Sequence, residues 1–175
     1  NFIHVSKLDY IVAESSDLIQ LPPPKIGEVQ KKIGEHVASL VKDGDCLQLG
    51  IGAIPDAVLL FLKDKKDLGI HSEMFSDGVV ELIEAGVITN ARKQIQKGQC
   101  VATFLMGTDR LYNYVNDNPS VNLIPVDVVN DPKVICQNDN VVSINSCVEV
   151  DLMGQVASES VGMKQISGVG GQVDF

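Results

Sequence analysis

Glu73 is the residue whose setting in this sequence most suggests chemistry. It follows the apolar stretch Leu68–His71, which predicts a strand, and it lies in Ser72–Gly78, which predicts a loop. A carboxylate at the end of a strand, rather than on a helix face, is poorly solvated. It can act as a covalent nucleophile when it lies beside an electrophilic carbonyl. The alternative is that Glu73 only accepts hydrogen bonds from loop amides.

Two glycine-containing segments could supply backbone amides to an anion. In Gly50-Ile51-Gly52-Ala53-Ile54-Pro55, the glycines permit close approach of a ligand and the amides point along the start of a helix, which favours negative charge. The later loop Ser167-Gly168-Val169-Gly170-Gly171-Gln172 could form an oxyanion hole or a diphosphate nest. Each also has a structural interpretation, because Gly-x-Gly alone often marks a tight turn. The first segment also lacks the third glycine and the downstream acidic residue of a dinucleotide fingerprint.

Other polar residues near these segments have simpler interpretations. A histidine at the end of a strand, such as His71, is more often structural than catalytic. Asp77, Asp109 and Asp127 are each expected to cap a helix.

Alternating strands and helices should position these segments. Such alternation implies parallel pairing through right-handed crossovers. Ligands of open parallel sheets bind beyond the carboxyl ends of the strands, so the turns Gly50–Pro55 and His71–Gly78 should face one crevice. Strands are predicted at Cys46–Leu49, Leu68–His71, Val101–Met106 and Val121–Pro125, and helices at Ile26–Val41, Asp56–Leu62, Val79–Ala85 and Asp109–Val115.

The two ends of the sequence depart from this alternation of strands and helices. Leu8–Ala13 predicts a strand, and Leu21-Pro22-Pro23-Pro24 predicts a stiff extended spacer. Val141–Leu152 and Gln155–Ala157 resemble a hairpin that turns at Met153-Gly154, so the sheet is expected to be mixed near its end. The first of these strands carries a polar patch, formed by Ser143, Asn145 and Ser146, which would line a site or face solvent.

Composition excludes several classes of function. A net charge of −9 disfavours a nucleic-acid partner, which would require clustered Lys and Arg. No apolar stretch approaches the roughly 18 to 20 residues of a spanning helix, so no membrane partner is expected. The 4 cysteines lie far apart without metal-ligand spacing, which argues against zinc and indicates reduced thiols in a cytoplasmic setting.

Four segments together resemble the acetyl-CoA hydrolase/transferase family, and in particular its 4-hydroxybutyrate and butyryl-CoA:acetate CoA-transferase members. Each segment is modest alone, but the four occur in register along nearly the whole chain. They are Gly50–Ala57, Gly69–Met74 with Ser76-Asp77-Gly78, Ser143-Ile144-Asn145-Ser146, and Ser167–Phe175.

The resemblance implies a ping-pong transfer of coenzyme A between short-chain carboxylic acids through Glu73. The glutamate attacks the acyl-CoA thioester to give an acyl-glutamyl anhydride, and the CoA thiolate then forms a glutamyl-CoA thioester. An acceptor carboxylate then attacks the glutamyl-CoA thioester, and the same steps run backwards to give the new acyl-CoA. The segments 50–54 and 168–171 would contact developing oxyanions or CoA, with Gly170 or Gly171 the better donor in the later loop. Coenzyme A thioester is then a substrate, and no metal or permanently bound cofactor is implied.

The resemblance also implies a fold and a domain organisation. The fold would be an open, mostly parallel α/β sheet with helices on both faces, of the CoA-transferase (NagB/RpiA-like) kind. Residues 1–24 would lead in from a missing N-terminal domain, and residues 25–175 would form a C-terminal domain truncated at its own end. The expected partners are acyl-CoA, short-chain acids, the N-terminal domain and a second subunit in a homodimer.

Three alternatives stay open. Water could replace the acceptor acid, which would make the protein an acetyl-CoA hydrolase. A non-catalytic domain that binds nucleotides or phosphorylated sugars could share the same layout, with Glu73 positioning a hydroxyl. The isolated domain could also be inert without residues from elsewhere. The sequence does not identify the acyl donor or acceptor.

Overall fold

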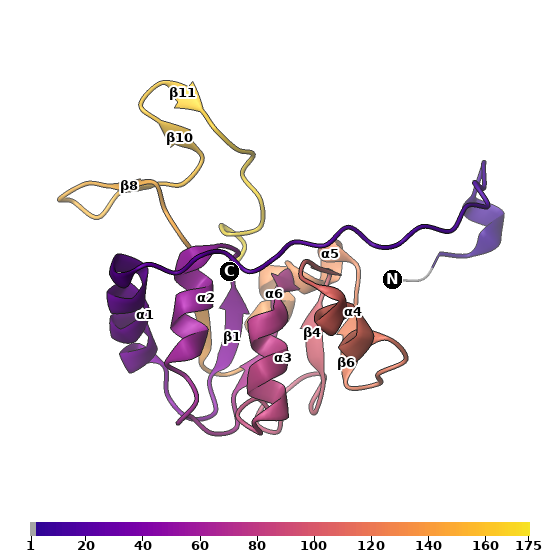
Figure 1. Ribbon diagram of the computed structural model, residues 1–175, viewed down its shortest axis with the longest axis horizontal. Coiled ribbons are helices and arrows are strands. Elements are labelled where there is room, and N and C mark those ends of the chain that lie inside the picture. Colours follow the sequence, from indigo (N-terminus) through magenta and orange to yellow (C-terminus); the bar gives the residue numbers. More distant parts are fainter. Residues whose placement is uncertain (1–2) are drawn as a thin grey trace.

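Parallel strands and crossover helices form the body of the computed structural model, which describes residues 3–175 (Figure 1). A short 3-10 helix, η1 (Val5–Lys7), precedes an extended segment that leads into this body. The helices of the body are α1 (Glu28–Leu40), α2 (Ala53–Leu60), α3 (Asp77–Glu84), α4 (Asp109–Val115), α5 (Val126–Val129) and α6 (Pro132–Ile135). Its strands are β1 (Cys46–Leu49), β2 (Gly69–Ile70), β3 (Met74–Phe75), β4 (Cys100–Ala102), β5 (Phe104–Leu105), β6 (Val121–Leu123) and β7 (Val141–Ile144).

The strands of the body pair in parallel, as the alternation of elements predicts. The sheet with the order β2-β1-β7 has β1 at its centre, and β4 pairs with β6 while β3 pairs with β5. A parallel bridge between His71 and Val101 connects β2 to β4. The carboxyl ends of these strands therefore lie along one edge, where the loop containing Glu73 begins.

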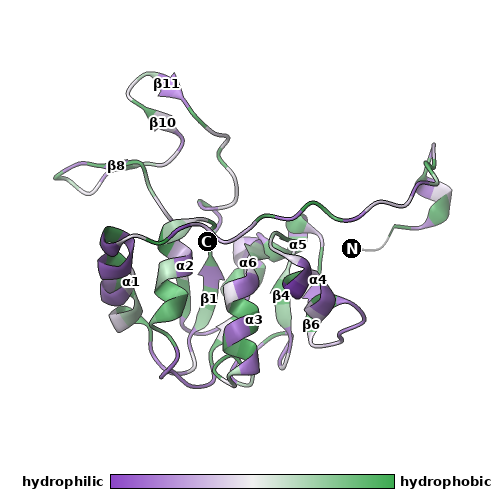
Figure 2. Cartoon of the chain, viewed as in Figure 1, coloured by the Kyte–Doolittle hydropathy of each residue, from purple (hydrophilic) through white to green (hydrophobic). Residues whose placement is uncertain are grey.

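Burial explains why the central strand is so apolar. All four residues of β1 are buried, which is typical of a parallel strand covered on both faces. Helices α1, α2 and α3 lie side by side (Figure 1), and Gly34 permits close contact between α1 and α2 because a Cβ there would lie 2.7 Å from the backbone of Ala57. Figure 2 shows α2, between its two neighbours, as predominantly hydrophobic and α1 as more hydrophilic.

Two hairpins project from the body near the C-terminus (Figure 1). They are β8 (Glu149–Val150) with β9 (Val156–Ala157) and β10 (Ser160–Val161) with β11 (Lys164–Gln165), both antiparallel. The predicted turn at Met153-Gly154 is confirmed, but a single strand over Val141–Leu152 is wrong. Residues 141–144 instead form β7, which pairs with buried β1 because its own apolar residues are covered there.

Other predicted elements also differ from the structure. Leu8–Ala13 is extended and exposed without a strand partner, so the predicted strand is wrong. The predicted strand Val101–Met106 is split into β4 and β5 at Thr103, whose amide donates to the backbone oxygen of Glu73. Within residues 3–175, no helix is long and apolar enough to cross a membrane.

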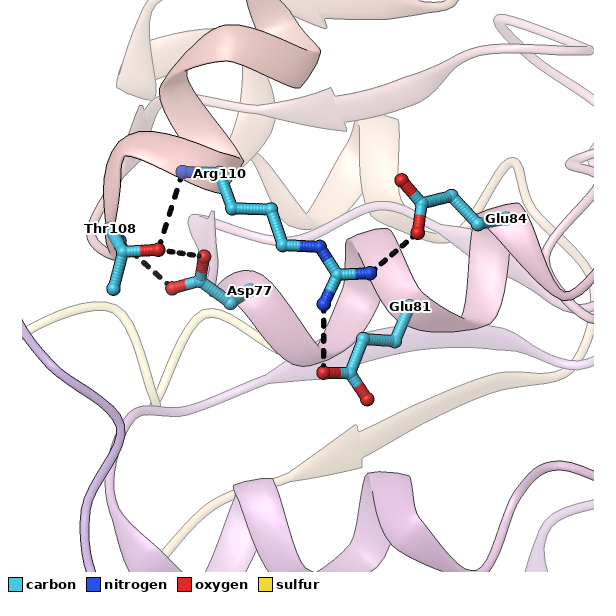
Figure 3. A network of polar contacts seen from close by, with 5 residues as sticks. All are labelled: Asp77, Glu81, Glu84, Thr108 and Arg110. Atoms are coloured by element: carbon cyan, nitrogen blue, oxygen red, sulfur yellow. Dashed lines mark hydrogen bonds and ion pairs between the residues drawn. The ribbon is translucent and has the colours of Figure 1, made fainter.

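The predicted capping roles of three aspartates are also wrong. Asp77, Asp109 and Asp127 lie inside the first turns of α3, α4 and α5, one or two residues after the N-cap. Asp77 instead accepts hydrogen bonds from the backbone amide and hydroxyl of Thr108, at 2.9 and 2.7 Å (Figure 3). Figure 3 also shows Arg110 of α4 paired with Glu81 and Glu84 of α3, so polar contacts join these two helices.

Candidate active site

Glu73 lies in the bend between β2 and β3, at the carboxyl edge of the strands. Its backbone oxygen accepts hydrogen bonds from the amides of Thr103 (2.8 Å) and Phe104 (3.2 Å), which fix the bend. Its side chain is half-buried. The carboxylate has neither a hydrogen bond nor an ion pair with any part of residues 3–175. The interpretation of Glu73 as a residue that only bonds its loop amides therefore lacks support here.

Gly171 is the part of the late glycine loop that reaches Glu73. A Cβ at Gly171 would lie 2.1 Å from Oε2 of Glu73 and 2.3 Å from Nδ2 of Asn130, so both side chains approach this glycine. Gly171 is buried, whereas residues 161–170 are exposed. Gly168 and Gly170 have no neighbouring atom within 4 Å of a built Cβ. Of the loop residues predicted for the site, the structure brings Gly171 to the carboxylate and leaves Gly168, Val169 and Gly170 in solvent.

Asn130 is a site residue that the sequence analysis missed. It is the C-cap of α5 and is 8% exposed, and its Nδ2 donates to Asp174 at 3.2 Å. Its Oδ1 is buried and has no partner among the described residues. The sequence offered only a weak signal for this residue, an asparagine before Asp131-Pro132, where one short helix ends and another begins.

His71 lies behind this group and is only 1% exposed. Its Nε2 is 2.9 Å from the backbone oxygen of Val129, while its Nδ1 is buried without a partner among residues 3–175. Burial lowers the pKa of His71 below its ordinary value, although the bond to Val129 acts in the opposite direction. The imidazole therefore stays neutral at physiological pH, with Nε2–H as the donor.

The turn at Gly50 starts from the neighbouring strand end. The amide of Gly50 donates to the backbone oxygen of Ile144 at 2.8 Å, so this amide is not free for a ligand. The amides of Ile51, Gly52 and Ala53 have no partner within residues 3–175. Gly52 is the N-cap of α2 with φ 112°, a backbone conformation that favours glycine. Three amides at a helix N-terminus thus remain available, and the next residue, Ile54, is half-buried in the first turn.

Ser72 joins this turn to the bend containing Glu73. Its buried hydroxyl accepts from the amide of Leu49 at 3.1 Å and donates to the backbone oxygen of Met74 at 2.6 Å. The expectation that the two turns lie together is supported further by a cavity of about 330 Å³, because Ile51, Gly52 and Ser76 all line it. The proline-containing segment Leu21–Pro24 covers part of this cavity, and Glu73 does not line it.

The predicted polar patch is a hydrogen-bonded network on β1 and β7. Gln48, which is 4% exposed, accepts from the hydroxyl of Ser143 (2.5 Å) and from Nδ2 of Asn145 (2.7 Å), and it donates back to Oδ1 of Asn145 at 3.1 Å. A Cβ at Gly50 would lie 2.9 Å from Oδ1 of Asn145. The network therefore supports the start of the Gly50 turn, and Ser146 takes no part in it.

The fold and this site define an α/β domain with backbone amides at the carboxyl edge of parallel strands and, at the same edge, a carboxylate without a partner among residues 3–175. Residues 107–175 match the model of the acetyl-CoA hydrolase/transferase C-terminal domain. The chain is 68% identical, over its whole length, to the 4-hydroxybutyrate coenzyme A transferase of Clostridium kluyveri, and it covers 41% of that protein. It is 52% identical, over 99% of its length, to the succinyl-CoA:cyclohexane-1-carboxylate CoA transferase of Geobacter metallireducens, of which it covers 40%.

Solved structures of similar proteins also superpose on this chain. A 4-hydroxybutyrate CoA-transferase from Porphyromonas gingivalis superposes with a TM-score of 0.83 at 48% identity, over 88% of this chain and 39% of that one. RipA from Yersinia pestis superposes with a TM-score of 0.86 at 45% identity, over 98% of this chain and 38% of that one. The chain belongs to the acetyl-CoA hydrolase/transferase family. It spans about two fifths of the length of the curated relatives named above.

Proposed function

We propose that the protein containing this chain transfers coenzyme A between carboxylic acids, with Glu73 as the covalent nucleophile. One observation carries the proposal: the half-buried carboxylate of Glu73 has no partner within residues 3–175 and lies against Gly171. A carboxylate held in place by its backbone, with both oxygens free, is available to attack a carbonyl carbon.

The reaction proceeds through two kinds of covalent intermediate. An oxygen of Glu73 attacks the thioester carbonyl, the C–S bond breaks, and an acyl-glutamyl anhydride and CoA thiolate form. The thiolate then attacks the glutamyl carbonyl and releases the donor acid, which carries away an oxygen of Glu73. An acceptor carboxylate attacks the resulting glutamyl-CoA thioester, and the same steps in reverse give the new acyl-CoA. No step requires a redox cofactor or a net gain of protons.

Amide donors at the carboxyl edge of the strands would stabilise the negative oxygen that develops in each step. The free amides of Ile51, Gly52 and Ala53 form one group, and Gly171 with the side-chain amide of Asn130 forms the other. Gly50 has a conformational role because its amide is occupied by Ile144. Preorganised donors of this kind are worth about 10² to 10³ in rate each.

Substrates and partners extend this proposal. The 4-hydroxybutyrate coenzyme A transferase of Clostridium kluyveri and a butyryl-CoA:acetate CoA-transferase from Anaerostipes caccae, to which the chain is 44% identical, support 4-hydroxybutyrate, butyrate and acetate as the acids. We infer an N-terminal domain in residues beyond this chain, with residues 1–24 leading in from it, as well as a homodimer and a cytoplasmic location. We also infer that the parallel strands form one open sheet of the NagB/RpiA-like kind, with helices on both faces.

Covalent trapping tests the proposal. The full-length protein is mixed with butyryl-CoA, treated with borohydride, which reduces a glutamyl-CoA thioester to an alcohol, and mapped by mass spectrometry. The modification is expected on the Glu73 peptide, to be lost in Glu73→Gln, and to persist in Glu35→Gln, which changes an exposed glutamate on α1. Active transfer without modification of that peptide would exclude Glu73 as the nucleophile, and CoA release without an acceptor acid would identify a hydrolase.

A further inference from the structure

His71 and Glu73 are two residues apart and face the same two segments of the chain. His71 contacts Val129 at the end of α5 and lies near Phe175, with a ring-centroid distance of 6.1 Å. The side chain of Glu73 approaches Gly171, four residues before Phe175, and so does that of Asn130, the next residue after Val129. Residues i and i+2 of an extended segment point to the same side, which explains this shared environment.

The bond from His71 to Val129 is well placed to fix Asn130. A backbone oxygen only accepts hydrogen bonds, so Nε2 must carry the proton in the 2.9 Å contact. Val129 is fully buried, as is the histidine ring. The bond therefore holds the carbonyl that precedes Asn130, and with it the direction in which the asparagine side chain leaves the backbone.

The same ring also contacts the segment that contains Gly171. Phe175 packs against it at an interplanar angle of 60°, and the neighbouring Asp174 accepts a hydrogen bond from Asn130 at 3.2 Å. The amide of Asp174 in turn donates to the backbone oxygen of Gly171 at 3.1 Å. His71 thus contacts both segments, one ending in Asn130 and the other beginning at Gly171, that lie beside Glu73.

We propose that His71 is a positioning residue for the site around Glu73. The His71 ring holds the end of α5 and the turn 171–175 in place, so that Asn130 and Gly171 stay beside the carboxylate. This inference rests on the proposed function. His71 takes no proton from the substrate and touches no reacting atom. Its effect is on the geometry of the donors, and a misplacement of about 1 Å at an active site can cost on the order of 10²-fold in rate.

Paired variants of the full-length protein test this role. His71→Phe keeps a ring beside Phe175 but removes the bond to Val129, whereas His71→Gln supplies a donor without the ring. The control is His36→Gln, which changes an exposed histidine on α1. We measure kcat and KM for acyl-CoA and for the acid, the rate of Glu73 labelling, and thermal unfolding.

The His71→Phe protein should fold, and its kcat and Glu73 labelling rate should fall about 10- to 100-fold with KM little changed. This range corresponds to a displacement of Asn130 and Gly171 by about 1 Å. His71→Gln should retain more of the activity, and His36→Gln should match the unaltered protein. A folded His71→Phe protein with unaltered kcat, or a loss seen only in KM, would overturn the inference. If His71→Phe does not fold, His71→Gln is compared with His71→Met, and equal kcat values overturn it.

The failure of this inference is distinct from failure of the proposed function. If Glu73 in the unaltered protein is never labelled by acyl-CoA, the proposed function fails and the role of His71 fails with it. If Glu73 is labelled at the same rate in the His71 variants, only the positioning role is overturned.

Discussion

Two clusters of polar groups at the parallel strands, one around Lys93 and one around Glu73, differ in how many of their hydrogen bonds are made. In the first cluster, Lys93 is 3% exposed and donates to the backbone oxygens of Ile70 (2.9 Å) and Gln99 (2.7 Å). Asn90 beside it bonds the amide of Ile70 and the thiol of Cys100. At the carboxyl end, the carboxylate of Glu73, Oδ1 of Asn130 and Nδ1 of His71 have no partner within residues 3–175.

We propose that this difference separates a structural cluster from a functional one. Buried polar groups are normally hydrogen-bonded, and each that is not raises the free energy of the folded state. In the cluster around Lys93, the hydrogen bonds of Lys93 and Asn90 join β2 to the start of β4. The group around Glu73 leaves oxygen and nitrogen atoms open, as expected where a substrate completes the bonding. Substitutions in the two clusters should therefore have opposite effects on activity and stability.

Glu73→Gln should produce the largest effect on activity. Loss of the nucleophile is expected to lower kcat by about 10⁴-fold or more, as for other covalent catalysts. The free energy of unfolding should change by less than about 0.5 kcal/mol, because the carboxylate makes no bond within residues 3–175. Steady-state kinetics and urea unfolding give both values, and a strongly destabilised variant would contradict the comparison.

Gly171→Ala should have the next largest effect, with Gly168→Ala as its matched control. An added Cβ at Gly171 would contact Oε2 of Glu73 and Nδ2 of Asn130, whereas one at Gly168 would meet nothing within 4 Å. We expect turnover to fall about 10²-fold or more for Gly171→Ala, on the scale of a lost oxyanion donor, and to stay unchanged for Gly168→Ala. Equal turnover in the two variants would show that the loop acts elsewhere.

Lys93→Met should destabilise the protein and leave the chemistry intact. The change leaves two buried carbonyl oxygens without their donor, at a cost of about 1 to 3 kcal/mol each, partly offset by removal of a buried charge. Denaturant unfolding should show a net loss of about 2 kcal/mol, with kcat per folded molecule unaltered. A loss of kcat in the folded variant would place Lys93 in the catalytic machinery.

The smallest predicted effect is a dependence of stability on pH. Burial lowers the pKa of Lys93 to about 8 from 10.5, so above pH 8 the folded protein releases this proton before the unfolded chain does. Stability should therefore rise between pH 8 and 9, by at most about 1.4 kcal/mol per pH unit. Burial raises the pKa of the Cys46 thiol from 9.0 to about 11, which opposes the rise above pH 9. Urea unfolding should show no rise from pH 8 to 9 in Lys93→Met.

Sequence patterns predicted elements well where a segment is buried by its own neighbours. The predicted bounds of β1 (Cys46–Leu49) and α4 (Asp109–Val115) match the structure, because apolar periodicity records burial. Leu8–Ala13 has the residue types of a strand but pairs with no strand among the described residues. A local sequence pattern indicates strand propensity and does not determine whether a partner strand is present. The predicted cap at Asp77 failed for a related reason, since its carboxylate instead accepts hydrogen bonds from Thr108 of a distant segment.

The residues of the candidate site also fall into two groups, those that local sequence patterns predict and those that they do not. Glu73 and the Gly50 turn could be predicted as site residues because the ends of apolar strands and the glycines after them indicate the carboxyl edge of a parallel sheet. Asn130 and the choice of Gly171 over Gly168 depend on contacts between segments about 60 to 100 residues apart. Such contacts leave no periodic signal, so only the folded chain reveals them.

Transfer of an oxygen isotope tests the central claim most directly. In the proposed reaction, the acceptor acid leaves one of its oxygens on Glu73 when the CoA thiolate cleaves the second anhydride. Turnover of the full-length protein with butyryl-CoA and ¹⁸O-labelled acetate should therefore place ¹⁸O in the Glu73 peptide and not in the peptide containing Glu35. Rapid transfer that leaves the Glu73 peptide unlabelled would contradict catalysis through this carboxylate.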